Sequence, residues 1–327
     1  MKIILIDPPG FGEGISTGLA YLVAIAKKNG FDDIKVVDFQ NYRQDINERM
    51  EKIIEESPDI IGITVNSFTI INALDIIKQL RDKLQKTKFI AGGPGVTSDP
   101  KIFLQRTKGL FDIGVFGEGE ITFVELLDYF KENKPANLSQ FAGLVYWIDE
   151  NIIVNQKRAL NFDLDGLALP NYDVFDSVET NLLEKNYQIL TSRGCPAHCV
   201  FCMNIVLNQA IWRGRSPENV IDELVLAKKK YNIESFTIRD DNFTQDMDRA
   251  EKICERLIEL NFNIPWKCKA AIRADRVRPS LLRKMKQSHC KGLTLGIESG
   301  DRNIFPLIQK GESLDKIVTG INMIKEA

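Results

Sequence analysis

The chain has 327 residues, 44% hydrophobic and 27% charged, which is typical of a globular protein of about two domains. A formal net charge of −2 gives no electrostatic reason to expect nucleic acid as a partner, and no apolar run approaches the roughly 20 residues of a membrane-spanning helix. Six cysteines in a chain of this length do not indicate a disulfide framework, so we expect a protein of the reducing cytoplasm.

Residues 1–135 alternate apolar strands with helical patterns. Strands are expected over 3–6, 34–39, 60–65, 88–91 and 113–116, and helices over 19–28, 46–56, 70–84 and from the last strand to 131. Five such strands separated by helices predict an α/β fold with a doubly wound, Rossmann-like parallel sheet. Its ligand would lie beyond the carboxyl ends of the strands, where the glycine-rich segments 10–14, 92–95 and 117–119 fall.

A dinucleotide is one candidate ligand for this sheet, because Asp38 ends the second strand. The segment 10–15 does not spell G-x-G-x-x-G, however, and Glu13 would place negative charge where a pyrophosphate should bind. A purely structural domain is the other alternative that the residues leave open.

Residues 136–185 are expected to link two domains, with a hairpin over 143–154 and a proline-containing connector over 167–173. In residues 186–327, strands are expected near 188, 236, 268 and 294, with helices over 217–231, 249–260, 281–288 and 314–326. This second strand–helix alternation predicts another parallel sheet, in the form of a partial (β/α) barrel.

Three cysteines, Cys195, Cys199 and Cys202, follow the first strand of this half. Thiolates this close together select an iron–sulfur cluster, zinc or copper(I). A structural zinc site needs a fourth ligand, and only His198 is near in sequence. The trio therefore fits better a cubane cluster with one open iron, the alternative being buried cysteines that pack as small hydrophobes. The remaining cysteines, Cys254, Cys268 and Cys290, are scattered and are expected to be structural.

The pattern Cys195-x-x-x-Cys199-x-Phe201-Cys202 after a predicted strand resembles the signature of the radical S-adenosylmethionine (SAM) enzymes. The resemblance implies that the three cysteines hold a 4Fe–4S cluster whose open iron binds the amino and carboxylate groups of SAM. It also implies that one electron, from a donor such as flavodoxin or ferredoxin, cleaves SAM to a 5′-deoxyadenosyl radical. Phe201 would lie near the adenine, unless it is an ordinary core aromatic.

Polar residues follow the later strands of this half and should meet at one rim of the sheet. They are Asp240, Asp241, Arg273, Glu298 and Ser299. SAM requires a cation near its carboxylate and acceptors near its amino group and ribose hydroxyls. The resemblance implies that Asp240 and Asp241 lie at the amino group, and Glu298 and Ser299 at the ribose or carboxylate. We favour Asp241 and Glu298 as contacts, then Arg273, against the alternative that each only caps an element end.

Residues 1–130 resemble the cobalamin-binding domain of cobalamin-dependent radical SAM enzymes. The matching segments are 7–9, 19–22, 66–67, 92–94 and 116–120. The cofactor contacts that the resemblance implies are Pro9, Gly10, Asn66, Ser67, Gly92, Gly93, Pro94, Gly117, Glu118 and Gly119. The domain has no D-x-H-x-x-G motif and no histidine. The lower face of cobalt is therefore expected to be unligated, or met by Asn66, Ser67 or Phe68.

Together the two resemblances imply a class B-like, cobalamin-dependent radical SAM methyltransferase that acts on an unactivated carbon of a small molecule or peptide. A cyclase or rearrangement enzyme with the same cofactors is the first alternative. A non-catalytic iron–sulfur or zinc module beside a doubly wound binding domain is the second. Barrels of this family have six strands or more, whereas four are counted here, so we expect a truncated chain rather than a barrel that a partner closes.

Overall fold

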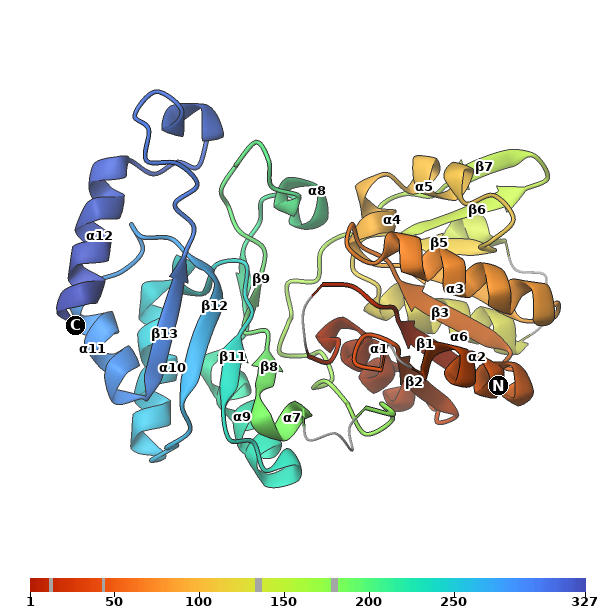
Figure 1. The fold of residues 1–327 in the computed structure, drawn as a ribbon, viewed down its shortest axis with the longest axis horizontal. Coiled ribbons are helices and arrows are strands. Elements are labelled where there is room, and N and C mark those ends of the chain that lie inside the picture. Colours follow the sequence, from red (N-terminus) through yellow and green to blue (C-terminus); the bar gives the residue numbers. More distant parts are fainter. Residues whose placement is uncertain (12–13, 43–44, 133–136, 178–181) are drawn as a thin grey trace. The chain divides into compact units, whose positions relative to one another are not determined.

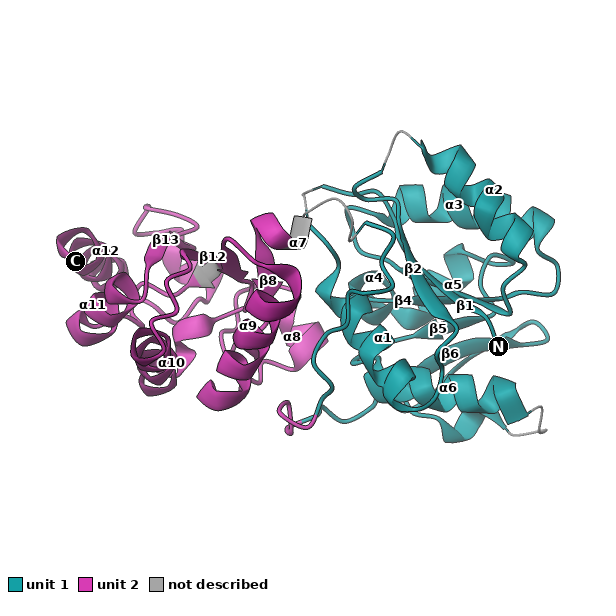
Figure 2. Ribbon diagram, turned by 90° about the horizontal axis from the view of Figure 1, so that it is seen from below, with its two compact units in different colours: residues 1–161, 167–180 teal, residues 162–166, 181–327 magenta. Residues whose placement is uncertain are grey.

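The computed structural model describes residues 1–11, 14–42, 45–132, 137–177 and 182–327. They form two compact units, one of Met1–Asn161 with Leu167–Thr180 and the other of Phe162–Gly166 with Asn181–Ala327 (Figure 2). Gly12 and Glu13, which bear on the dinucleotide alternative, lie outside the described residues. Within those ranges, no helix combines the length and the apolar character that a membrane crossing requires.

The first unit is built on a seven-stranded sheet in the order β2-β1-β3-β4-β5-β6-β7 (Figure 1). Its strands are β1 (Ile3–Asp7), β2 (Ile34–Asp38), β3 (Ile60–Thr64), β4 (Lys88–Gly92), β5 (Ile113–Val115), β6 (Leu144–Ile148) and β7 (Asn151–Val154). The first five are parallel, which confirms the doubly wound fold.

The five parallel strands are confirmed, but the hairpin β6–β7, which was placed in a linker, extends this sheet because β6 pairs antiparallel with β5. The physical reason is that β5 would otherwise leave an unpaired edge. Leu144, Val145 and Tyr146 of the hairpin are buried against the unit.

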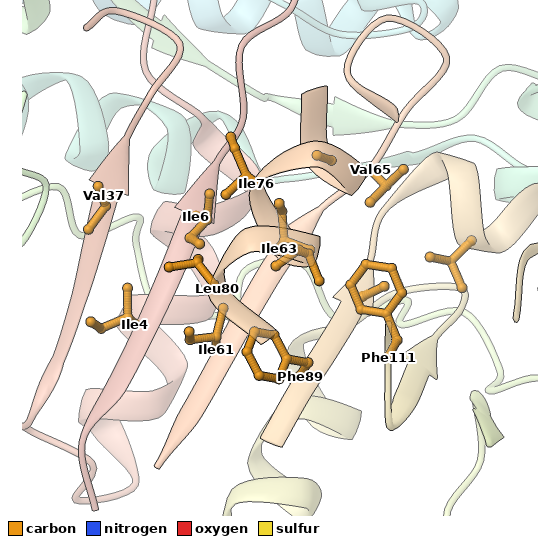
Figure 3. Packing of buried hydrophobic residues seen from close by; sticks show 14 of the residues in the cluster. Ile4, Ile6, Val37, Ile61, Ile63, Val65, Ile76, Leu80, Phe89 and Phe111 are labelled. Atoms are coloured by element: carbon orange, nitrogen blue, oxygen red, sulfur yellow. The ribbon is translucent and has the colours of Figure 1, made fainter. Parts of the chain in front are cut away.

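The helices of the first unit cover both faces of its sheet. They are α1 (Thr17–Lys28), α2 (Ile46–Glu56), α3 (Ile70–Lys83), α4 (Pro94–Ser98), α5 (Pro100–Arg106), α6 (Glu120–Glu132) and a 3₁₀ turn, η2 (Leu138–Gln140). Alternate strand residues such as Ile4 and Ile6 share one face with Ile76 and Leu80 of α3 (Figure 3). Each such fully buried side chain contributes about 1.5–3 kcal/mol of hydrophobic stabilisation.

A segment of the connector protects the opposite edge of this sheet. The N–H of Val36 in β2 donates to the carbonyl oxygen of Val174 at 2.9 Å, and the N–H of Asp176 donates to the carbonyl oxygen of Val36 at 3.2 Å. Phe175 forms a parallel bridge with Val36. The connector thus acts as a short additional edge strand.

The second unit contains a four-stranded parallel sheet in the order β13-β12-β11-β8, as predicted. Its strands are β8 (Tyr187–Ile189), β11 (Phe236–Ile238), β12 (Trp266–Ile272) and β13 (Cys290–Leu295), with a separate pair of β9 (Ser192–Arg193) and β10 (Arg213–Gly214). Its helices are α7 (Leu182–Lys185), α8 (Asn204–Asn208), α9 (Pro217–Tyr231), α10 (Met247–Glu259), α11 (Pro279–Gln287) and α12 (Leu314–Glu326), with 3₁₀ turns η4 (Phe243–Gln245) and η5 (Phe305–Ile308).

Candidate active site

The cysteine loop begins at Gly194, directly after β9. Gly194 has a φ of +85°, and a Cβ atom there would lie 2.0 Å from the carbonyl oxygen of Ile211. Its N–H donates to Oδ2 of Asp241 at 2.9 Å. Only glycine fits this position, and Asp241 fixes the direction in which the loop leaves the strand.

The three cysteines of the loop are free thiols. Burial raises the pKa of the Cys199 thiol, the nearby Lys310 lowers it, Cys202 and Cys195 raise it further, and Arg273 lowers it. The charges of Cys195, Cys202, Lys310 and Arg273 therefore all act on the Cys199 thiol. In the described part of the chain, no three Cys, His, Asp or Glu side chains are already arranged as a metal site. Three soft donors on one loop nevertheless fit the predicted 4Fe–4S cluster in their chemistry.

Two N–H groups contact these thiols, and an exposed aromatic ring lies on the same loop. The side-chain amide of Asn242 donates to Sγ of Cys195 at 3.8 Å, and the N–H of Asn204 donates to Sγ of Cys202 at 3.5 Å. Such bonds to sulfur stabilise a thiolate that binds metal. Phe201 is 58% exposed, which excludes the alternative of an ordinary core aromatic.

The scattered cysteines differ from those of the loop. Burial raises the pKa of the Cys254 thiol to about 12 and of the Cys290 thiol to about 11, and it raises that of Cys268 well above the usual range. Thiols held protonated in apolar surroundings are inert, in keeping with a structural role.

The neighbouring carboxylates after β11 make different contacts. Asp240 is fully buried and accepts hydrogen bonds from Thr191 N at 2.6 Å, Thr191 Oγ1 at 2.5 Å and Ser192 Oγ at 2.6 Å. Burial raises the pKa of Asp240, and the charge of Arg249 opposes this. Both oxygens of Asp240 therefore hold the chain that enters the cysteine loop. Asp241 uses Oδ2 for Gly194, and no described residue bonds its Oδ1.

The guanidinium group of Arg273, which follows β12, is engaged in hydrogen bonds within the second unit. Its guanidinium donates to both carboxylate oxygens of Asp275 at 3.0 and 3.1 Å. It also donates to the carbonyl oxygens of Lys310 at 2.7 Å and Gly311 at 3.1 Å. These bonds shape the turn that follows η5, so Arg273 acts in this structure as an anchor for the segment that carries Lys310.

Lys310 is a cation that the sequence analysis missed. It is 7% exposed, and its ammonium contacts the carbonyl oxygen of Gly296, Oε1 of Glu298 at 3.3 Å and Oε2 of Glu312 at 3.6 Å. No strand end or spacing marks Lys310 in the sequence, because the fold alone brings it to the rim.

The predicted rim residues after β13 take an unusual backbone path. Glu298 has a φ of +67°, which is rare for a residue with a side chain and often marks a functional site. The hydroxyl oxygen of Ser299 accepts a hydrogen bond from the N–H of Asp301 at 3.1 Å, so Ser299 stabilises this turn. Glu298 thus contacts Lys310, whereas Ser299 contributes only to the turn in which it lies.

Two glycines at the carboxyl edge of the first unit differ in their surroundings. Gly93 has a φ of +94°, and a Cβ there would lie 2.8 Å from Oγ1 of Thr64, so the packing of the chain itself requires glycine. Gly117 has a φ of +85° and open space around the corresponding position, and its N–H donates to Oγ1 of Thr97 at 3.0 Å. A ligand can approach the backbone closely at Gly117, as a cobalamin cradle requires.

Other predicted cobalamin contacts form part of the loops themselves. The carbonyl oxygen of Pro9 accepts a hydrogen bond from Asn72 at 2.9 Å, and the N–H of Gly10 donates to Gln40. Glu118 accepts a bond from the N–H of Asn161 at 2.8 Å. The remaining predicted cobalamin contacts lie at or just after the ends of β4 and β5. They are Gly92, Pro94 and Gly119.

The three residues considered for the lower face of cobalt are not equivalent. Oδ1 of Asn66 accepts hydrogen bonds from the N–H groups of Phe68 at 2.8 Å and Thr69 at 3.1 Å, at the start of α3. Ser67 and Phe68 are exposed. The ring of Phe68 meets that of Phe11 edge to face, with centroids 5.8 Å apart. The side-chain oxygen of Asn66 is therefore occupied by hydrogen bonds within the loop. Ser67 and Phe68 instead present surface that a ligand can reach.

A pocket of about 740 Å³ lies elsewhere in the first unit. Lys88, Asp112 and Ile113 at the amino ends of β4 and β5 line it, together with Tyr129 and Trp147. These are the opposite ends of the strands from those that carry the glycine loops. The pocket is thus separate from the predicted cofactor edge.

Family models match both units of the chain. Residues 10–127 match the B12 binding domain, and residues 189–327 match the radical SAM superfamily. An uncharacterized methyltransferase of Pyrococcus horikoshii is 31% identical over 98% of this chain and 71% of its own length. An anaerobic magnesium-protoporphyrin IX monomethyl ester cyclase of Rubrivivax gelatinosus is 23% identical over 100% of this chain and 60% of its own length.

A solved structure has the same fold. The radical SAM methyltransferase TsrM from Kitasatospora setae, with cobalamin and a 4Fe–4S cluster bound, matches with a TM-score of 0.82 at 15% identity. The match covers 100% of this chain and 65% of TsrM, so the present chain spans about two thirds of that protein.

The domain families, the relatives and the site agree with one another. The cofactors that go with the two families are SAM with a 4Fe–4S cluster in the second unit and cobalamin in the first. The chain therefore belongs to the radical SAM superfamily, as one of the cobalamin-dependent enzymes that carry a B12-binding domain ahead of the radical SAM domain.

Proposed function

We propose that this enzyme transfers a methyl group to an unactivated carbon of a small molecule or peptide. The observation that carries the proposal is the loop of three free thiols, fixed by Asp241 and close to the cation Lys310. When bound, the cluster with SAM supplies a radical that abstracts hydrogen, and cobalamin supplies the methyl group.

The residues of the second unit would hold and orient SAM. Cys195, Cys199 and Cys202 would bind iron, and the ammonium of Lys310 would pair with the SAM carboxylate. Oδ1 of Asp241, which no described residue bonds, is suited to accept from the SAM amino group. Glu298 and the exposed ring of Phe201 would serve the ribose and the adenine.

Within this proposal, Asp240 and Arg273 are positioning residues. Asp240 holds Thr191 and Ser192 at the entry to the loop, and Arg273 holds the turn at Lys310. Holding the reacting groups in one geometry removes much of the entropic cost of bringing them together. In the first unit, Gly117 would let the corrin approach the backbone.

A cyclase is the second candidate. The Rubrivivax cyclase aligns with the whole of this chain, and its identity of 23% does not separate a methyl transfer from a ring closure. The side chains of the cysteine loop would serve either reaction, because both begin with hydrogen abstraction.

The proposal also includes a partner and a compartment. Cleavage of SAM needs one electron, for which we propose a low-potential flavodoxin or ferredoxin. An oxygen-sensitive cluster and six free cysteines suit the cytoplasm. No role for nucleic acid is proposed, since the net charge is −2.

The test is an anaerobic incubation of reconstituted protein with SAM, a strong reductant and hydroxocobalamin. We expect 5′-deoxyadenosine and a corrin that stays with the protein through gel filtration. Absence of both 5′-deoxyadenosine and protein-bound corrin would contradict the proposal. With a candidate substrate, transfer of label from methyl-labelled SAM to the product separates methyl transfer from cyclisation.

A further inference from the structure

Three consecutive residues after β11 contact the start of the cysteine loop. The first two, Asp240 and Asp241, accept hydrogen bonds from the chain that enters the loop. The third, Asn242, donates from its side-chain amide to Sγ of Cys195 at 3.8 Å. The carboxylates thus position the backbone, whereas Asn242 reaches the sulfur atom of a proposed iron ligand.

Hydrogen bonds fix the orientation of the Asn242 amide. The residue is 0% exposed, and its backbone carbonyl oxygen accepts a hydrogen bond from Nε1 of Trp212 at 3.0 Å. Its Nδ2 group also donates to Oε1 of Gln245 at 3.0 Å, so each of the two amide hydrogens has an acceptor. A thiolate bound to iron can only accept hydrogen bonds, so it favours the same orientation, with the amide nitrogen toward Cys195.

Packing alone does not account for a buried amide at this position. Oδ1 of Asn242 is buried and has no hydrogen-bond partner among the described residues. An apolar side chain of similar size would fill the same space without leaving a buried acceptor unsatisfied. The hydrogen bond from Nδ2 offsets this cost most fully when its acceptor carries charge, as a thiolate that binds iron does.

We propose that Asn242 is a positioning residue that acts through Cys195 to raise the reduction potential of the 4Fe–4S cluster. One electron from the proposed flavodoxin or ferredoxin reduces the cluster, and its charge is shared by the sulfur atoms. An N–H group directed at such a sulfur atom stabilises the reduced state more than the oxidised state. The hydrogen bond therefore makes the cluster easier to reduce. This inference rests on the proposed function, because it assumes that Cys195 binds iron.

The experiment measures the midpoint potential of the cluster in reconstituted protein without SAM, by anaerobic redox titration followed by electron paramagnetic resonance. Asn242→Ala should lower the potential by about 30–60 mV, a roughly threefold to tenfold smaller equilibrium constant for reduction at about 59 mV per tenfold. A packing role predicts the opposite sign, because water that enters the vacated space would stabilise the reduced cluster. Thr244→Val is the matched control and should leave the potential unchanged. Thr244 is buried in the adjoining turn η4, and its Oγ1 bonds to no described residue.

Gln245→Ala is the second variant, and it leaves Asn242 in place. It removes the acceptor that orients the amide, so we expect a smaller shift in the same direction. A potential that stays or rises in Asn242→Ala, or that falls equally in Thr244→Val, would overturn the inference. Should Asn242→Ala take up no iron, an unchanged potential in Gln245→Ala would overturn it instead. Failure of the proposed function is distinct, since the wild type would then hold no iron or form no 5′-deoxyadenosine from SAM.

Discussion

The two units use one architecture, a parallel sheet with helices, but they treat its edges and its carboxyl ends differently. In the first unit, the connector at Val174 and the hairpin β6–β7 cover the two edges of the parallel strands. In the second unit, β13 is an edge strand of its sheet, and its residues are half-buried or exposed. The five parallel strands of the first sheet thus have a neighbour on both sides, whereas β13 pairs on one side only among the described strands.

The loops at the carboxyl ends differ in their chemistry as well. Those of the first unit expose backbone at glycines such as Gly117 and aromatic rings such as Phe68. Those of the second unit bring thiols and charged groups together and hold them with hydrogen bonds. In both units the sheet places the site at the carboxyl ends of its strands. The residues of the loops there then determine whether the site accommodates a large ligand or binds a metal.

The largest expected effect breaks the metal chemistry of the second unit. Cys199→Ala removes one of three iron ligands, so we expect loss of essentially all cluster iron after anaerobic reconstitution. Iron content and visible absorption measure this. Cys268→Ala is the matched control, because Cys268 is a buried structural thiol. Equal iron loss in both variants would contradict the assignment.

A core substitution should affect the first unit instead. Phe89 is fully buried in β4, among the apolar side chains of the cluster in Figure 3. Phe89→Ala is expected to lower the free energy of unfolding of this unit by about 3–5 kcal/mol, because it leaves a cavity. Denaturant titration followed by circular dichroism measures the loss. The variant should still bind iron, because the cysteines belong to the second unit. Loss of iron without unfolding would contradict the assignment of metal binding to the second unit alone.

The first unit also contains a buried acid that should make its stability depend on pH. Burial, and then the charge of Asp38, raise the pKa of Asp7 to about 8. The folded state therefore holds a proton that the unfolded chain releases near pH 4, so stability falls as the pH rises between about 4 and 8, by up to about 1.4 kcal/mol per unit.

Asp7→Asn should remove this dependence and raise the melting temperature at pH 8 more than at pH 5. Thermal unfolding at both pH values provides the measurement. A variant that loses stability equally at pH 5 and pH 8 would show that Asp7 is ionised in the folded state.

The smallest expected effect concerns ligand approach at a glycine. Gly117→Ala should weaken cobalamin binding by about tenfold, since the methyl group occupies open space beside a left-handed backbone. Gly109→Ala is the matched control, because Gly109 has a similar φ of +84° and equally open surroundings away from the cofactor edge. Spectrophotometric titration with hydroxocobalamin gives the two Kd values. Equal weakening in both variants would assign the effect to backbone strain.

Much of the fold could be predicted from the sequence because apolar periodicity and glycine stops are local signals. The predicted helices 46–56 and 314–326 agree with α2 and α12 at both ends. The docking of β6–β7 onto β5 could not be predicted, because a hairpin pattern says nothing about which edge it covers.

The site was predictable only where residues act through sequence spacing. The three cysteines are close in sequence, and Asp241 follows a strand. Asp240 and Arg273 also follow strands, yet their side chains turn into the protein and bond to it. Lys310 and Glu312 reach the rim through a turn that depends on Arg273, which is a tertiary contact without a local signature.

The most direct test of the central claim is the electron paramagnetic resonance spectrum of the reduced, reconstituted protein, recorded without and with SAM. The account predicts one 4Fe–4S signal whose g values shift when SAM is added, because the fourth iron has no protein ligand. A spectrum that SAM leaves unchanged, or a protein that retains zinc and no iron, would contradict it.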